Sequence, residues 1–438
     1  MEIVFCTVPM MGHLMPLIPY ASELHHQRGH KVVFVHDDDP KYRQKLDSCG
    51  LGSCESITYN ASNENESMYD AILSYYNGKS TKPDVIVYDF FAVDGADAAD
   101  KLGDVPAIGV FPNPRSVNPW AASIEEQQTV KWNVWCKCMW GMESILARML
   151  WCGRNYQRWT RNLSMLPEQD LYPSPYMPRH IIGCTSSIIE FPNLPEASKF
   201  YMVGPSLPPV VDPMDTKLKE WLNAHRSKRI VYVAFGTMYK YTKSNVQHLE
   251  KELMSFDDTD IAIIWSLPKQ YQCWLSQKQH TGELPSAWYV HSFLPQVSLL
   301  QSGKVDAFVT HCGSNSVYEA LLSGVPMICC PGMADQPANA TRLARLGVGV
   351  IARDGKVGEA FKHLLLNEEE YDKFRMNSSN IASQLKSNDS AIKAATLIEQ
   401  IARGDIIDDI IDDIDAKKRI PWWPAAFLLT LGATVALA

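Results

Sequence analysis

The sequence has no excess of positive charge, which excludes the partners that basic proteins bind. Its 438 residues carry 41 Lys and Arg against 49 Asp and Glu, a formal net charge of −8. Because phosphate backbones are bound by clustered Lys and Arg, no nucleic-acid partner is expected. Hydrophobic residues make up 46% of the chain and charged residues 21%. This balance is typical of a globular protein, and the length suggests two domains of about 200 residues each.

The sequence also shows neither the pattern of a cysteine framework nor that of a secretion leader. The 11 cysteines are odd in number and scattered. Cys136 and Cys138 form a single C-x-C pair without the second half that a zinc site needs. Met1 leads directly into an apolar run, without a basic segment or a cleavage site before it. We therefore expect reduced thiols, a location on the cytoplasmic side and no metal site.

The last eighteen residues, Pro421–Ala438, contain no charged side chain. Three basic residues stand before this apolar tail and a tryptophan pair near its start, an order that is typical of a membrane anchor. The tail is short for a span of roughly twenty residues, and Pro424 shortens the usable helix. We expect a C-terminal anchor over 420–438. The alternative is an apolar tail that packs on the protein itself.

Short β-branched runs alternate with helical stretches in both halves of the chain, a pattern that predicts parallel sheets covered on both faces. These runs are residues 3–8, 31–35, 85–88, 107–111, 229–235, 261–265, 307–310 and 325–329. The glycine and prolines of Val203–Pro209 interrupt the alternation.

The alternation predicts an α/β protein with two Rossmann-like, doubly wound domains. Their expected bounds are residues 1–203 and 213–395, with a linker at 204–212 and a terminal helix or acidic linker at 396–416. Ligands of such sheets bind at the carboxyl ends of the strands, so we expect a cleft between the domains. Neither half has G-x-G-x-x-G after a strand, which disfavours a nicotinamide or flavin cofactor.

One helix-like stretch is rich in tryptophan. Trp132, Trp135, Cys136, Met139 and Trp140 fall on one face of a helix, and apolar residues at 145–150 continue that face. The stripe is either core packing or the wall of an apolar acceptor pocket, since Trp and Met supply large adaptable surfaces.

The most informative pattern is a strand, a sharp turn and a helix start at residues 310–319. A helix start presents unpaired N–H groups and a positive dipole end, which suit a phosphate. His311 stands just before the turn at Gly313 and can reach the same anion. Ser316 adds a hydroxyl donor, and Glu319 can accept hydrogen bonds from two ribose hydroxyls.

The whole stretch from Phe293 to Gln336 resembles the donor-binding signature of the family 1 UDP-dependent glycosyltransferases, which include plant secondary-product enzymes. Flanking features match in order up to about residue 400. The resemblance implies a GT-B fold, a UDP-sugar as co-substrate and no cofactor. It also implies a donor-binding set, which comprises Thr237, Phe293, Gln296, His311, Gly313, Ser314, Asn315, Ser316, Glu319, Asp335 and Gln336.

The family pattern implies contacts to the nucleoside and to the transferred sugar. Phe293 takes the place of a tryptophan that stacks on uracil, and it keeps a π-face. Gln296 would read the uracil or the ribose, and Glu319 would hold the ribose. Asp335 and Gln336 would bind sugar hydroxyls. Gln336 resembles the residue associated with glucose, so glucose is the expected sugar.

The same pattern implies a diphosphate site around His311, with Asn315 and Ser316 beside it. Thr237, in Phe-Gly-Thr after the first strand of the second half, resembles a further phosphate-side hydroxyl. Ser314 departs from the pattern, because plant members usually have a tryptophan there. This departure leaves the sugar side of the expected pocket less well defined.

The first half is expected to supply a general base. His13, in Gly-His-Leu-Met-Pro, follows the first strand, and Asp89 ends another. Both positions match the family's His-Asp pair. A neutral imidazole with a pKa near 6.5 can take a proton from an acceptor hydroxyl as the bond forms, and the carboxylate fixes its tautomer. The family mechanism implies inversion at the anomeric carbon.

The acidic run at 37–39 follows a strand of the first half, away from the expected donor site, so no metal is predicted to be required.

Several alternative functions stay open. The chain could instead transfer GlcNAc, or act on a sterol or another lipid. It could also be a non-catalytic UDP-sugar-binding protein, a class that the His13 and Asp89 pair argues against. We expect a small hydroxylated, lipophilic acceptor.

Overall fold

The computed structural model describes residues 1–406 except 64, 104, 115–142, 167–178, 193–198, 238, 257–259, 276–283 and 388. These residues form two compact units. The first takes the described residues from Met1 to Val210 and those after residue 388, and the second runs from Val211 to Ser387. The tryptophan stripe at 132–140, the C-x-C pair and the tail at 420–438 lie outside the described residues.

The first unit contains a seven-stranded parallel sheet with the order β3-β2-β1-β4-β5-β6-β7. Its strands are β1 Glu2–Cys6, β2 Lys31–Asp37, β3 Glu55–Tyr59, β4 Val85–Asp89, β5 Ala107–Phe111, β6 His180–Gly183 and β7 Phe200–Met202. Strands β2 and β3 extend the sheet on one side of β1, and the next strand along the chain, β4, pairs with β1 on its other side. The carboxyl ends of β1 and β4 therefore form a topological switch point, where α/β proteins bind ligands.

Both faces of this sheet are buried, as its continuous apolar strands predict. Side chains that alternate along the strands, such as Val4 and Cys6, pack against helices α4 (Met68–Tyr76) and α5 (Val93–Leu102). Gly95 lets α5 approach closely, because a Cβ there would lie 2.9 Å from the Cys6 sulfur.

The remaining helices of the first unit are α1 Met11–Leu14, α2 Ile18–Ser22, the π-helix η1 Glu23–Gln27, α3 Pro40–Ser48, α8 Glu143–Thr160 and α18 Ser390–Arg403. Asp39, from the acidic run at 37–39, caps α3 by accepting a hydrogen bond from the Lys41 N–H at 2.9 Å.

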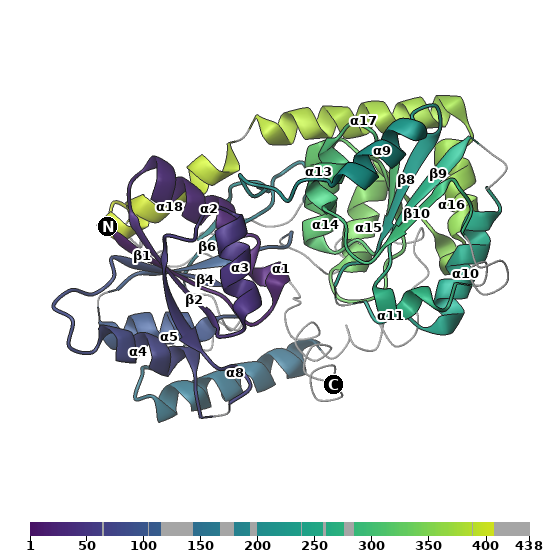
Figure 1. The fold of residues 1–438 in the computed structure, drawn as a ribbon. Coiled ribbons are helices and arrows are strands. Elements are labelled where there is room, and N and C mark those ends of the chain that lie inside the picture. Colours follow the sequence, from purple (N-terminus) through teal and green to yellow (C-terminus); the bar gives the residue numbers. More distant parts are fainter. Residues whose placement is uncertain are drawn as a thin grey trace. The chain divides into compact units, whose positions relative to one another are not determined.

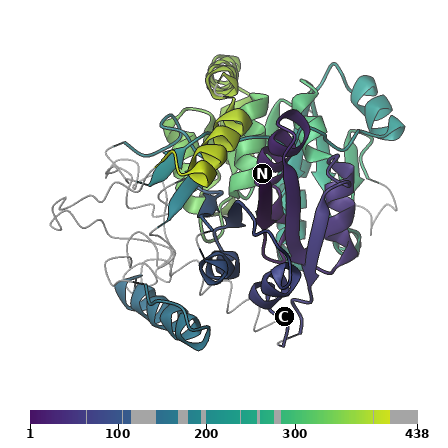
Figure 2. The ribbon, with the colours of Figure 1, turned by 90° about the vertical axis from the view of Figure 1, so that its left-hand side faces the viewer.

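Helix α18 comes last along the described chain and packs on α2 and η1 of the first unit (Figures 1 and 2). Glu399 accepts from Arg28 at 2.8 Å and lies 2.6 Å from a ring nitrogen of His30. The domain end expected at residue 395 falls inside this helix, and the whole of α18 belongs to the first unit. The packing of α18 on α2 and η1, which local sequence does not show, places this helix in the first unit.

Helix α8 is held by a buried charge network. Asp97, which is fully buried on α5, pairs with Arg154, Arg158 and Arg161 of the α8 region. The chain at 145–150 is helical as expected.

The second unit contains a six-stranded parallel sheet with the order β10-β9-β8-β11-β12-β13. Its strands are β8 Arg229–Ala234, β9 Ile261–Ser266, β10 Trp288–His291, β11 Ala307–Thr310, β12 Met327–Cys329 and β13 Gly349–Ile351. Its helices are α9 Thr216–Ala224, α10 Lys243–Met254, α11 Lys269–Gln272, α13 Gln296–Gln301, α14 Ser314–Ser323, α15 Gln336–Arg345, η4 Arg353–Gly355, α16 Val357–Leu365 and α17 Glu368–Lys386. Here the switch point lies between β8 and β11.

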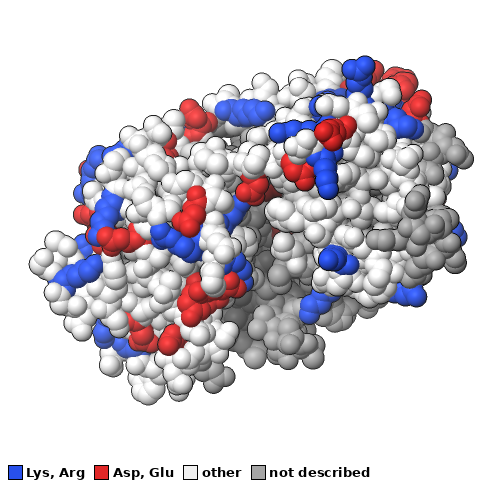
Figure 3. All heavy atoms as spheres, viewed as in Figure 1, with Lys and Arg blue, Asp and Glu red and all other residues white. Residues whose placement is uncertain are grey.

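The described surface is mixed in charge. Lys and Arg side chains are interspersed with Asp and Glu on the face shown in Figure 3, without a basic patch.

Every cysteine in the described part is a free thiol. Across the described residues, no helix has the length and apolar character to cross a membrane, and no group of three or more His, Cys, Asp or Glu could hold a metal.

Candidate active site

One cluster of candidate residues lies at the switch point of the first unit. Strand β1 ends at Cys6, and the short helix α1 carries His13 in its last turn. Asp89 is the last residue of β4, the strand next to β1. Parallel pairing places both strand ends at the same sheet edge, so the imidazole and the carboxylate meet there.

His13 and Asp89 form a hydrogen bond of 2.8 Å between Nδ1 and Oδ1. Asp89 is 2% exposed and the His13 side chain 14% exposed. The other Asp89 oxygen accepts from the Phe91 N–H, and the Phe91 ring lies 4.9 Å from the imidazole. A carboxylate can only accept, so Nδ1 carries the proton and a neutral ring keeps its lone pair on Nε2. No described residue hydrogen bonds to Nε2.

A thiol beside Asp89 was not expected from the sequence. Cys184 follows β6, and its sulfur lies 3.2 Å from the Tyr20 hydroxyl. Burial raises the Cys184 pKa to about 12, and the nearby negative charge of Asp89 adds to that rise. The neutral thiol therefore adds no charge next to the His-Asp pair. Strand β6 was not predicted, so no signal pointed to this residue.

In the second unit the turn after β11 has a left-handed residue. Cys312 has φ of +67°, a conformation that costs free energy in a residue other than glycine. Thr310 Oγ1 accepts from the Cys312 N–H at 3.2 Å, and the Asn339 amide donates to the Cys312 carbonyl at 3.0 Å. Gly313 is the N-cap of α14 and has no side chain to cap the helix.

His311 stands in a slot between two glycines. A Cβ at Gly236 would lie 2.7 Å from its ring, and a Cβ at Gly313 would lie 2.6 Å from it. Burial lowers the His311 pKa to about 4, so the ring is neutral at pH 7. Its Nδ1 is buried and has no hydrogen-bond partner among the described residues. A buried imidazole next to the start of α14, with one of its nitrogens unpaired among the described residues, suits the binding of a phosphate oxygen.

Gln296 and Glu319 are brought together with Ser316. The Gln296 amide donates to Glu319 at 2.6 Å and to the Ser316 hydroxyl at 3.1 Å. Its carbonyl accepts from the hydroxyl of Tyr232, a buried residue of β8, at 3.1 Å. The sequence pattern named Gln296, Ser316 and Glu319, which lie on α13 and α14, but it did not indicate Tyr232, which lies on strand β8, 64 positions before Gln296.

Asp335 and Gln336, which were expected to bind sugar hydroxyls, accept hydrogen bonds from other groups of the protein. Asp335, which is 7% exposed, accepts from Ser314 and Asn339. The Gln336 side-chain oxygen accepts from the N–H groups of Gly332 and Met333, at 2.9 and 3.1 Å. The sequence did not single out Asn339.

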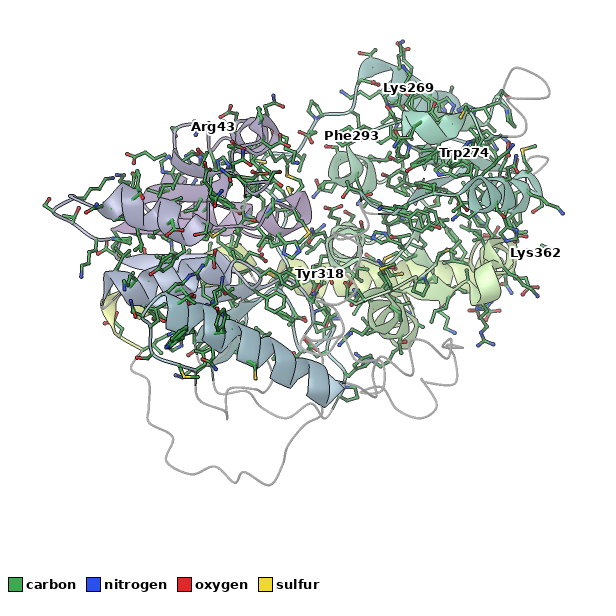
Figure 4. All side chains as sticks on the ribbon, turned by 90° about the horizontal axis from the view of Figure 1, so that it is seen from below. Arg43, Lys269, Trp274, Phe293, Tyr318 and Lys362 are labelled. Carbon is green, nitrogen blue, oxygen red and sulfur yellow. The ribbon has the colours of Figure 1, made fainter. Side chains whose placement is uncertain are left out.

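The last three expected donor residues lie at loops and a helix start. Phe293, labelled in Figure 4, follows β10 and is 67% exposed. Thr237 is exposed just after β8, and Asn315 lies in the first turn of α14. The structure thus puts Thr237, His311 and Asn315 at the carboxyl ends of β8 and β11.

Comparison with solved structures identifies the fold as GT-B, as predicted. The glycotransferase of kitacinnamycin superposes with a TM-score of 0.68 at 20% identity, covering 91% of this chain and 98% of that one. The UDP-glucose: anthocyanidin 3-O-glucosyltransferase in complex with UDP superposes with a TM-score of 0.64 at 17% identity, covering 91% and 99%.

The model of the family described as "UDP-glucoronosyl and UDP-glucosyl transferase" matches residues 147–392, more than half of the chain. The chain belongs to this family.

Curated relatives match over a shorter stretch. Myricetin 3-O-rhamnosyltransferase of Crocosmia x crocosmiiflora is 37% identical over 161 residues, 35% of each chain. Solanidine UDP-glucose glucosyltransferase 1 of Solanum tuberosum is 32% identical over 133 residues, 30% of this chain and 27% of that protein. The matched stretch spans about a third of the length of these relatives.

Proposed function

We propose that the protein transfers a sugar from a UDP-sugar to a hydroxyl of a small lipophilic acceptor, with inversion at the anomeric carbon. The observation that carries this proposal is the His13 imidazole. Its Nδ1 is bound by Asp89, and its Nε2 has no partner among the described residues. A non-catalytic UDP-sugar-binding protein has no need of a histidine oriented in this way.

His13 acts in this mechanism as the general base. As the acceptor oxygen attacks the anomeric carbon, Nε2 takes its proton, and the Asp89 carboxylate stabilises the imidazolium that forms. The bond between the anomeric carbon and the diphosphate oxygen breaks in the same displacement. UDP leaves with the electron pair of that bond.

The second unit supports the leaving group. Negative charge grows on the diphosphate as the bond breaks, and preorganised donors stabilise such charge. The start of α14 and the buried Nδ1 of His311 are the donors that we assign to it. Gln296 and Glu319 bind the ribose, and Phe293 stacks on the uracil.

We propose glucose as the sugar, because Gln336 resembles the family residue that is associated with glucose. The relatives are named for rhamnosyl and for glucosyl transfer, so the donor has to be measured. Their names include myricetin and solanidine. We propose acceptors of that general kind, small polycyclic molecules with a hydroxyl group.

The test is UDP release from UDP-glucose with a panel of phenols, flavonoids and sterols. We expect acceptor-dependent release by the wild type and a loss of about a hundredfold or more in His13→Ala. His26→Ala, which removes an exposed histidine of the same unit, is the matched control and should keep full activity. Equal turnover of wild type and His13→Ala would overturn the base assignment. UDP binding without turnover for any donor or acceptor would favour the binding-protein alternative.

A further inference from the structure

Tyr232 carries a hydroxyl group into the interior of the second unit. The residue is 1% exposed, and its ring stacks on that of Phe308 from the adjacent strand β11, with ring centroids 5.0 Å apart. A phenylalanine could make the same ring contact. A buried hydroxyl costs free energy unless it is hydrogen bonded, so the oxygen of Tyr232 needs a polar partner.

That partner is the side-chain amide of Gln296, the first residue of α13. The Tyr232 hydroxyl donates to Gln296 Oε1 at 3.1 Å. Burial and the negative charge of Glu319 raise the pKa of Tyr232, and the Ser266 hydroxyl opposes this rise. The hydroxyl therefore keeps its proton at neutral pH and remains a donor.

The other end of the amide is held by two residues of α14. Gln296 Nε2 donates to Oε2 of Glu319 at 2.6 Å and to the hydroxyl of Ser316 at 3.1 Å. A carboxylate can only accept a hydrogen bond, so Nε2 faces Glu319 and Oε1 faces Tyr232. Rotation of the amide by half a turn would place its oxygen against the carboxylate. The amide is thus fixed from both ends.

These bonds connect the centre of a sheet to a residue of the candidate nucleotide site. Tyr232 lies within β8, which pairs with β9 on one side and with β11 on the other. Glu319 lies on α14, which packs on α13. A carboxylate that a fixed donor already orients loses less conformational freedom when hydroxyl groups bind to it, and this preorganisation strengthens binding.

We propose that Tyr232 is a positioning residue for the ribose site: it orients the amide of Gln296 and, through this amide, the carboxylate of Glu319. The inference rests on the proposed function, because it takes Glu319 as the residue that holds the ribose of a UDP-sugar. It adds to the site a buried tyrosine that acts on the nucleotide without touching it.

Tyr232→Phe removes the hydroxyl and keeps the ring that stacks on Phe308, so the fold should remain intact. We would measure the dissociation constants of UDP and of 2′,3′-dideoxy-UDP by competition calorimetry for the wild type and this variant. The variant should bind UDP about fivefold more weakly. Its affinity for the dideoxy analogue should be unchanged, because that analogue lacks both ribose hydroxyls that Glu319 would bind.

A second comparison uses Glu319→Gln as the background. Tyr232→Phe should have no further effect on UDP there, because both changes act on one network. Tyr371→Phe is the matched control. It removes a tyrosine hydroxyl that donates to Asp306 at 2.5 Å, at the amino end of β11 and thus at the opposite edge of the sheet from His311. This control should change neither affinity.

A loss of UDP affinity alone, absent in the Glu319→Gln background, supports the proposal. Equal losses for both nucleotides, or a loss of the same size in the Glu319→Gln background, overturns it. Unchanged affinities, with or without a lower melting temperature, also overturn it, and each of these results leaves the proposed function standing. If the wild type does not bind UDP, the proposed function itself fails.

Discussion

The imidazole Nδ1 of His13 lies 2.8 Å from Oδ1 of Asp89, although 76 positions separate the two residues in the chain. Adjacent parallel strands bring them together, since β1 and β4 end at one edge of the sheet. The bond leaves Nε2 as the nitrogen that can accept a proton. The proposed chemistry of the first unit depends on this one contact.

Asp89→Asn should lower the turnover number by about a hundredfold or more, because a neutral amide neither fixes the tautomer nor stabilises the imidazolium. Binding of UDP should be unchanged, since Asp89 belongs to the first unit and the donor residues to the second. Steady-state kinetics and calorimetry check both statements. Asp47→Asn, an exposed change on α3, is the control. A turnover number near that of the wild type would contradict the role of the carboxylate.

The buried His311 should make the protein less stable in mild acid. Its pKa is lowered from 6.5 to about 4, so between these pH values the unfolded chain holds a proton that the folded one lacks. The free energy of unfolding therefore rises with pH across this window and falls as the pH drops. The expected loss from pH 7 to pH 5 is about 2 kcal/mol.

Urea unfolding of the wild type and His311→Asn at both pH values measures that contribution. The variant lacks the titrating ring, so its stability should fall less between pH 7 and pH 5. Parallel pH dependence of the two proteins would show that His311 titrates near its ordinary pKa.

Gly236→Ala should weaken UDP binding by about tenfold, because the new methyl group displaces the His311 ring. Gly236 has φ of +73°, and its Cβ would lie 2.7 Å from that ring. Gly303 is a matched control, with φ of +70° and no atom within 4 Å of a Cβ. Both variants should lose about 1 kcal/mol of stability from backbone strain, but only Gly236→Ala should lose UDP affinity. Equal affinities in calorimetry would show that the slot does not govern binding.

Glu319→Gln should reduce discrimination between UDP and 2′-deoxy-UDP. If Glu319 holds the ribose, the wild type prefers UDP by about tenfold, because the deoxy analogue leaves a carboxylate hydrogen bond unmade. Competition binding with the two nucleotides measures the preference. Glu359→Gln, at an exposed glutamate of α16, should keep it. An unchanged preference in Glu319→Gln would remove this residue from the ribose site.

Phe293→Ala should weaken UDP binding by about tenfold without lowering the melting temperature. The ring is 67% exposed, so it contributes little to the core and is available to stack on uracil. Phe293→Trp should retain affinity, since the larger ring offers the same face. Leu366→Ala removes a similarly exposed apolar side chain and should have no effect on UDP. Full affinity in Phe293→Ala would exclude stacking by this residue.

The sequence by itself determined the fold class and the local pattern of the site. Continuous apolar runs such as Val85–Tyr88 predicted buried parallel strands. The residues around Gly313 predicted a strand, a sharp turn and the start of a helix. Strands β3, β6, β7, β10 and β13 were not predicted. Several of these strands are short; β13, for example, has three residues. A strand of that length contains too few residues to show an alternation of apolar and polar side chains.

Only the tertiary structure decided which side chains meet. The family pattern had implied the pair of His13 and Asp89, but the contact between Tyr232 on β8 and Gln296 on α13 became visible only in the folded chain. The packing of α15 beside α14 brings Asp335 to Ser314. The physical reason is that periodicity and turn chemistry act over a few residues. Hydrogen bonds between strand ends depend instead on sheet order and helix packing, which arise from burial of the chain as a whole.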